Sequence, residues 1–154
     1  MKLLSGASLI GLLAASLANA QGSRKRGHPP FSVTKFSAGA TPHSSIGYIE
    51  LSWSYSGGLN QTRCSASPGT YQVFPSIVQT SCSDPSTSFN LTKRADGGAD
   101  LVLWHETAPA AFAHAMHTIT TDEIVWTNQQ SPTGTVQVYA GPQNFTVKAV
   151  YPDM

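Results

Sequence analysis

Apolar and polar residues alternate along most of the chain after residue 30, as they do in β-strands with one buried face. Prolines, glycines and Ser/Thr clusters interrupt this alternation about every ten residues. Short strands separated by turns predict an all-β domain, either a compact antiparallel β-barrel or a barrel-like sandwich. The segments expected to be strands are 31–38, 46–55, 62–65, 71–78, 87–92, 100–106, 111–120, 123–126, 135–139 and 144–151.

Turn residues predict two hairpins. Asp96-Gly97-Gly98 separates segments 87–92 and 100–106, and glycine adopts a positive φ without steric cost. Ala140-Gly141-Pro142 separates the last two segments, which are expected to form a closing hairpin.

Three segments need separate interpretation. In segment 46–55 the apolar positions change phase, which predicts a β-bulge or a change of face. Pro75 places segment 71–78 at a sheet edge or interrupts it. Segment 111–120 is rich in alanine, but Thr118–Thr121 and the absence of a helix cap favour a strand.

The first twenty residues predict a secretory signal peptide. Lys2 supplies the charged start, residues 3–17 the apolar stretch, and Ala18-Asn19-Ala20 a cleavage site of small residues. The apolar stretch is too short, and too rich in Ser, Gly and Ala, to span a membrane. We therefore expect a secreted, extracellular protein.

Residues 21–26 end in Lys25-Arg26. They are either a propeptide that is removed at this dibasic site or a flexible basic tail, and residues 27–154 form the folded domain. Without the first 26 residues the chain keeps five of its nine basic side chains and all eight acidic ones, a net charge of about −3. This charge argues against nucleic acid or an anionic membrane as a partner.

The chain has two cysteines, Cys64 and Cys82. In an oxidising compartment two cysteines most simply pair with each other, so one intrachain disulfide is expected. Closing the loop between them stabilises the fold by about 3 kcal/mol.

Three sequons for N-glycosylation are present, at Asn60, Asn90 and Asn144. Asn60 follows Gly57-Gly58 in an expected turn and is the best acceptor. Asn90 and Asn144 lie in expected strands, where their side chains would face solvent.

Histidines are the residues that most suggest a catalytic or metal site. His105 and His114 can lie opposite each other across the turn at Pro109, with His117 nearby. In regular strands at most two of these imidazoles converge, whereas zinc needs three or four ligands, so neither a metal nor another cofactor is expected. The simpler interpretation is outward polar positions or hydrogen-bonded core histidines.

Two alternatives to a simple binding protein remain. The first is a small secreted hydrolase in which His105 acts with Glu50 or Glu123, although neither glutamate lies in a cleft motif. No G-x-S-x-G segment marks a serine nucleophile, so no catalytic residue is assigned and an enzyme is not expected. The second is a carbohydrate-binding module that uses exposed aromatic side chains, although such residues usually pack in cores. The candidates are Trp53, Trp104, Trp126, Tyr48, Tyr55, Tyr71 and Tyr139.

The chain resembles the Alt a 1-like (AA1-like) family of secreted fungal proteins over nearly all of the folded domain. Residues 31–37 are similar to the family's first strand, and Val138-Tyr139-Ala140 with Phe145-Thr146-Val147 to its last strands. The segments that resemble the family's central region are Thr62-Arg63-Cys64-Ser65-Ala66, Ser81-Cys82-Ser83, Phe89-Asn90-Leu91, Asp96-Gly97-Gly98, Leu101-Val102-Leu103-Trp104-His105, Phe112-Ala113-His114-Ala115 and Thr118-Ile119-Thr120.

This resemblance implies a compact antiparallel β-barrel in a family of allergens and of elicitors or effectors that engage plant defence proteins. It implies no enzymatic mechanism, and it matches Cys64 and Cys82 to the family's central disulfide. The chain lacks the cysteines with which some members form a second bridge and a covalent dimer, so we expect a monomer or a non-covalent dimer. The expected partner is a plant extracellular defence protein or a cell-wall component.

Overall fold

The structure is a computed structural model that describes residues 28–130 and 133–152. The expected signal peptide (1–20) and dibasic segment (21–26) lie outside the described residues. No helix in the described part is both long and apolar enough to cross a membrane. In chain order the elements are β1 (Phe31–Ala40), β2 (Gly47–Ser54), β3 (Gln61–Ala66), β4 (Ile77–Ser81), β5 (Thr87–Lys93), β6 (Ala99–Ala108), β7 (Ala111–Ile119), the 3₁₀ turn η1 (Thr121–Glu123), β8 (Ile124–Gln130), β9 (Thr133–Tyr139) and β10 (Phe145–Val147).

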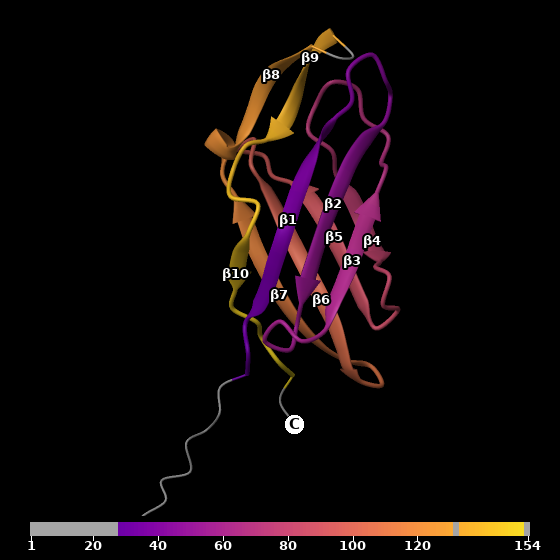
Figure 1. Ribbon diagram of the computed structural model, residues 1–154, viewed down its shortest axis with the longest axis vertical. Coiled ribbons are helices and arrows are strands. Elements are labelled where there is room, and N and C mark those ends of the chain that lie inside the picture. The colour runs from indigo at the N-terminus through magenta and orange to yellow at the C-terminus, as the bar shows by residue number, and fades with distance from the viewer. Residues whose placement is uncertain (1–27, 131–132, 153–154) are drawn as a thin grey trace, which may run out of the picture.

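The described residues form two antiparallel sheets (Figure 1). The first sheet has the order β3-β2-β1-β9-β8, with β10 also paired with β1, and the second has the order β4-β5-β6-β7. The prediction of an all-β antiparallel fold is confirmed, in the form of a barrel-like sandwich.

The core lies between the sheets and is filled by alternate residues of their strands. In β2, Ile49, Leu51 and Trp53 are buried, whereas Glu50 between them is exposed. This is the alternation that predicted the strand. The largest fully buried side chains are Trp53, Phe31, Phe36, Phe74, Phe89, Ile49, Leu91, Leu101, Leu103 and Ile119.

A β-bulge lies in β1. Its buried apolar residues change phase, from Phe31 and Val33 to Phe36 and Ala38. The register with β2 shifts in the same place, between Thr34 and Ser37. The one extra residue in β1 therefore shifts the alternation by one position, so that apolar side chains on both sides of the bulge point into the core.

The prediction of a bulge or a change of face in segment 46–55 is wrong. β2 keeps one register against β3 from Ile49 to Ser54. The apparent phase change arose because the apolar residues Ile46 and Tyr48 are not core residues: Ile46 is exposed and Tyr48 is half-buried. Gly47, the buried residue between them, has no side chain to signal an inward position.

The prediction of a strand over 71–78 is also wrong for most of that segment, because β4 begins only at Ile77. Gln72 has a φ of +60°, outside the strand region, and Pro75 has no N–H to donate. The N–H of the buried Phe74 instead donates to Oε1 of Gln137, at 2.8 Å. Pro75 thus interrupts the segment, and β4 forms an edge of its sheet.

The turn at Asp96-Gly97-Gly98 joins β5 and β6 as predicted. Gly97 has a φ of +91°, and the N–H of Gly98 donates to Oδ1 of Asp96 at 2.9 Å. The alanine-rich segment after the next turn is a strand, β7, as predicted.

The prediction that segments 135–139 and 144–151 form a closing hairpin is wrong. β9 pairs along its whole length with β8, and β10 pairs with β1, where Phe31 is opposite Val147 and Val33 is opposite Phe145. β8 extends to Gln130 and not only to Trp126, because its polar second half pairs with β9 even though it shows no hydrophobic alternation.

Candidate functional site

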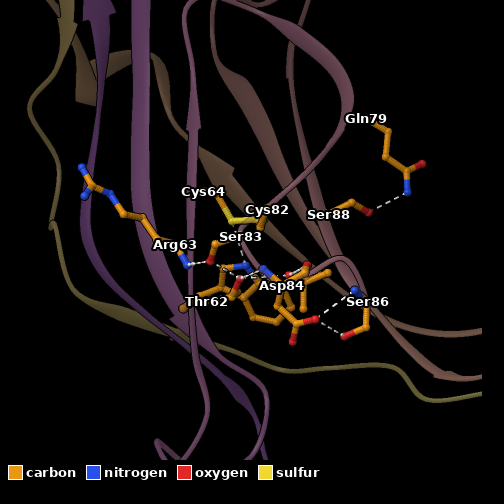
Figure 2. The surroundings of a disulfide bond; sticks show 11 residues. Thr62, Arg63, Cys64, Gln79, Cys82, Ser83, Asp84, Ser86 and Ser88 are labelled. Carbon is orange, nitrogen blue, oxygen red and sulfur yellow. Dashed lines mark hydrogen bonds between the residues drawn. A yellow bond between two sulfur atoms is a disulfide. The ribbon is translucent and has the colours of Figure 1, made fainter.

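The predicted disulfide between Cys64 and Cys82 is confirmed, and it joins the two sheets (Figure 2). Cys64 lies in β3, Cys82 directly follows β4, and their Cα atoms are 4.3 Å apart. Cys64 is fully buried, and the indole N–H of Trp53 donates to its Sγ at 3.2 Å.

Buried hydroxyl groups extend this connection between the sheets. Oγ1 of Thr62 lies 3.0 Å from Oγ1 of Thr87 and 3.2 Å from Oγ of Ser83, and it accepts the N–H of Asp84 at 3.1 Å. Oγ of Ser83 in turn accepts the N–H of Arg63 at 2.9 Å, a bond drawn in Figure 2. Thr62 and Thr87 are almost fully buried, so these bonds satisfy groups that water cannot reach.

Asp84 ends this network at the surface. Its Oδ1 accepts the N–H of Ser86 at 2.9 Å and the hydroxyl of Ser86 at 2.8 Å (Figure 2). Its Oδ2 accepts the hydroxyl of Tyr55 at 3.3 Å. These bonds, above all the one from the backbone N–H of Ser86, lower the pKa of Asp84. Sequence reasoning missed this residue, although Asp-Pro-Ser is a turn signal.

His105 lies beside this carboxylate. Its imidazole stacks on the ring of Tyr55, with centroids 3.5 Å apart, and its Nδ1 is buried with no hydrogen-bond partner among the described residues. Burial lowers the pKa of His105, against the opposing effect of the Asp84 charge. Burial, followed by the Asp84 charge, raises the pKa of Tyr55.

The other two strand histidines have different neighbours. The β6–β7 register places His114 opposite Trp104 and His105 opposite Ala113, so the two histidines do not face each other. His117 stacks on Phe145, with centroids 3.9 Å apart, and burial lowers its pKa. No group of three His, Cys, Asp or Glu residues that could hold a metal ion occurs in residues 28–130 and 133–152.

The two glutamates considered as partners of His105 also have other neighbours. Glu50 lines a polar cleft of about 280 Å³ with Lys35 and Arg63. Oε2 of Glu123 accepts the N–H of Thr120 at 2.8 Å, at the start of η1. The carboxylates whose charges oppose the lowering of the His105 pKa are those of Asp84 and Glu106, and not those of Glu50 or Glu123.

The three sequons differ in their surroundings. Asn60 is exposed in the turn between β2 and β3, as expected. Asn90 is half-buried in β5, and its Oδ1 is buried without a partner in the described residues. Asn144 is exposed but precedes β10, and its Oδ1 accepts the N–H of Lys35 at 3.0 Å.

The aromatic candidates for ligand stacking are divided between core and surface. Trp53 is fully buried, whereas Trp126 is 55% exposed and Tyr71 is 62% exposed. Trp104, Tyr48, Tyr55 and Tyr139 are half-buried. The seven side chains therefore do not form one platform.

The outer face of the second sheet carries an apolar surface that we call the β6–β7 patch. Side chains of one face alternate along each strand, so residues 102 and 104 of β6 lie beside 114 and 116 of β7. His114 also forms a β-bridge with Val150. Phe112, Met116 and Val150 are 43%, 56% and 55% exposed. The members of the patch are Val102, Trp104, Phe112, His114, Met116 and Val150.

No protein-family model matches this chain, and no curated protein matches its sequence. The surfaces and side-chain groups described above are therefore the basis for a proposed function.

Proposed function

We propose that the chain is a secreted binding protein of the Alt a 1-like type, an effector, elicitor or allergen-like protein of a fungus. It acts outside the cell on a plant extracellular defence protein or a cell-wall component. The β6–β7 patch is its binding surface.

The exposure of Phe112, Met116 and Val150 beside Trp104 is the observation that supports this proposal most. Single exposed apolar residues are ordinary, but a contiguous group of them marks an interaction surface. Tryptophan, phenylalanine and methionine are also the residue types enriched in protein interfaces, where a few buried anchors supply most of the affinity. A partner that covers this patch removes their apolar surface from water.

The disulfide supports the extracellular part of the proposal. A bridge that joins the two sheets next to the core suits an oxidising compartment. The signal-peptide pattern of residues 1–20 supports the same location.

Affinity capture from plant apoplastic fluid tests the proposal, together with infiltration of the purified protein into leaf tissue. The variant Phe112→Ser/Met116→Ser should lose at least about tenfold in affinity for the captured partner, as expected for interface anchors. Val78→Ser is the matched control, because Val78 is 83% exposed but lies on β4, away from the patch. Binding that is unchanged in the double variant, or lost equally in the control, contradicts the proposal.

A hydrolase remains the second candidate because His105 and Asp84 lie together with Tyr55. It requires turnover of RNA, glycans or esters that His105→Ala abolishes in a variant with unchanged melting temperature. The exposed Trp126 is the observation that favours a carbohydrate-binding module. Pull-down on chitin, glucan and cellulose with Trp126→Ala as the control tests that function.

A further inference from the structure

Among the described residues the two sheets have five edge strands, β3, β8 and β10 in one sheet and β4 and β7 in the other. An edge strand presents unpaired N–H and C=O groups that can pair with another chain, and proteins normally protect such edges. Four of these five edges carry a recognisable protection, which for β10 is its length of only three residues.

β3 and β7 are covered by other parts of the chain. The N–H of Ser83 donates to the carbonyl oxygen of Arg63 in β3 at 2.8 Å, and the disulfide at Cys64 fixes the same segment. In β7, His114 and Val150 exchange both of their backbone hydrogen bonds, at 2.9 and 2.8 Å. The C-terminal segment therefore blocks the middle of β7.

β4 is protected by its shape. It has five residues, and its register against β5 shifts between Ile77 and Thr80. Pro75 lies just before it and cannot donate a hydrogen bond. A short and irregular strand is a poor template for pairing with another chain.

β8 has none of these protections among the described residues. It has seven residues, pairs with β9 without a register shift, and has no described strand on its other side. In Figure 1 the β8–β9 hairpin forms the upper end of the first sheet. Its residues, Ile-Val-Trp-Thr-Asn-Gln-Gln, include no charge and no proline.

Trp126 adds an apolar contact to this edge. It lies on the same side of β8 as the buried Ile124, because side chains two residues apart share a face. Trp126 is nevertheless 55% exposed, and Asn128 and Gln130, which lie beyond it on that face, are also exposed. The face of β8 that carries Trp126 is thus exposed to solvent beyond Ile124.

We propose that β8 pairs with β8 of a second copy of this chain, antiparallel and across a two-fold axis at Thr127. In such a pairing each strand faces its own sequence, so any charge near the centre would meet the same charge. Pairing of a strand with its own copy therefore favours a strand without charged residues. β8 contains none, whereas β3 contains Arg63. Trp126 lies opposite Asn128 of the partner subunit, and the first sheets of the two copies become continuous. The interface uses backbone hydrogen bonds and needs no cysteine.

Substitutions of Asn128 test this interface, because residues 128 of the two copies are diagonal neighbours within reach of long side chains. Sedimentation of the secreted protein over a concentration series should show a monomer–dimer equilibrium. Asn128→Lys and Asn128→Asp should each raise the dissociation constant about tenfold, through like-charge repulsion. An equimolar mixture of the two variants should restore the dimer. Hydrogen exchange of the β8 amides should slow as the protein concentration rises.

Thr135→Lys is the matched control. Thr135 is exposed on β9 directly opposite Asn128. A lysine at this position therefore introduces the same charge as Asn128→Lys, but one strand away from the edge. This variant should dimerise as the unmodified protein does. A monomer at every concentration, a dimer that both Asn128 variants leave intact, or an equal effect of Thr135→Lys overturns the proposal. So does a monomer whose β8 binds another molecule, such as a glycan or an extended peptide, in its place.

Discussion

The imidazole of His105 lies flat against the phenol ring of Tyr55, with centroids 3.5 Å apart and ring planes 16° apart. Burial in this stack lowers the pKa of His105 below its ordinary value of 6.5. His117, stacked on Phe145, is held in the same way, and burial lowers its pKa too. Both imidazoles are therefore easier to protonate in the unfolded chain than in the folded protein.

We expect the free energy of unfolding to decrease as the pH falls below 6.5. In this range the unfolded chain binds more protons than the folded protein, so acid favours unfolding. The stability contribution of each histidine is complete above 6.5 and is lost as the pH falls through its lowered folded pKa. Urea unfolding from neutral to mildly acidic pH should show this slope, and His105→Gln and His117→Gln should each flatten it. A slope that neither variant changes contradicts the assignment.

Removal of the disulfide should weaken the fold but not abolish it. In Cys64→Ala/Cys82→Ala the unfolded chain is no longer closed into a loop between two positions that are 18 residues apart. The resulting gain in its conformational entropy lowers the free energy of unfolding by about 3 kcal/mol. The hydrogen bonds between Arg63 and Ser83 keep the same two segments in contact. Urea unfolding of the variant and the parent protein measures the difference, and equal midpoints would show that the bridge contributes nothing.

Local sequence was sufficient to predict most of the strands and the bridge. The alternation of Ile49, Leu51 and Trp53 identifies β2 because each residue reports its own burial. Cys64 and Cys82 could be paired because no other cysteine competes. The phase change from Val33 to Phe36 was also visible, although the bulge was expected in the neighbouring strand.

Contacts between distant segments could not be predicted in this way. β10 pairs with β1 and not with β9, which joins the first and last strands of the chain and has no local signal in either segment. The stack of Tyr55 on His105 joins residues of different sheets, and nothing near either residue signals the other. The network from Thr62 to Asp84 likewise joins segments about twenty residues apart.

Thr62→Val should destabilise the protein by about 1–3 kcal/mol, the usual cost of leaving buried polar groups without partners. Valine has nearly the same shape but cannot accept the N–H of Asp84 or bond to the hydroxyl of Thr87. Thr135→Val, on the exposed side of β9, is the control and should change stability little. Urea unfolding distinguishes the two variants. A loss of the same size in both would show that the network has no special role.

N-glycosylation should be concentrated at Asn60. Its side chain is exposed in a turn, whereas Oδ1 of Asn90 is buried and that of Asn144 bonds to the backbone of Lys35. Mass spectrometry of the protein expressed through the secretory pathway of a eukaryotic host, before and after enzymatic deglycosylation, measures the occupancy of each sequon. Asn60→Gln should remove most of the glycan mass, and full occupancy at Asn90 with none at Asn60 would contradict this order.

Lys35→Gly should stabilise the protein. Lys35 occupies the β1 bulge with a φ of +56°, a left-handed conformation that costs an L-residue about 1–2 kcal/mol and that glycine adopts freely. The side chain is exposed, and the backbone bond to Asn144 does not need it. The greater freedom of glycine in the unfolded chain offsets part of the gain and leaves about 0.5–1 kcal/mol.

Lys148→Gly provides the control for this substitution. Lys148 is also exposed and directly follows β10, but its φ is not positive, so glycine brings only the entropic loss there. Urea unfolding should therefore give shifts of opposite sign for the two variants. A loss of stability in Lys35→Gly as large as that in Lys148→Gly would mean that the bulge imposes no conformational cost on the residue at its centre.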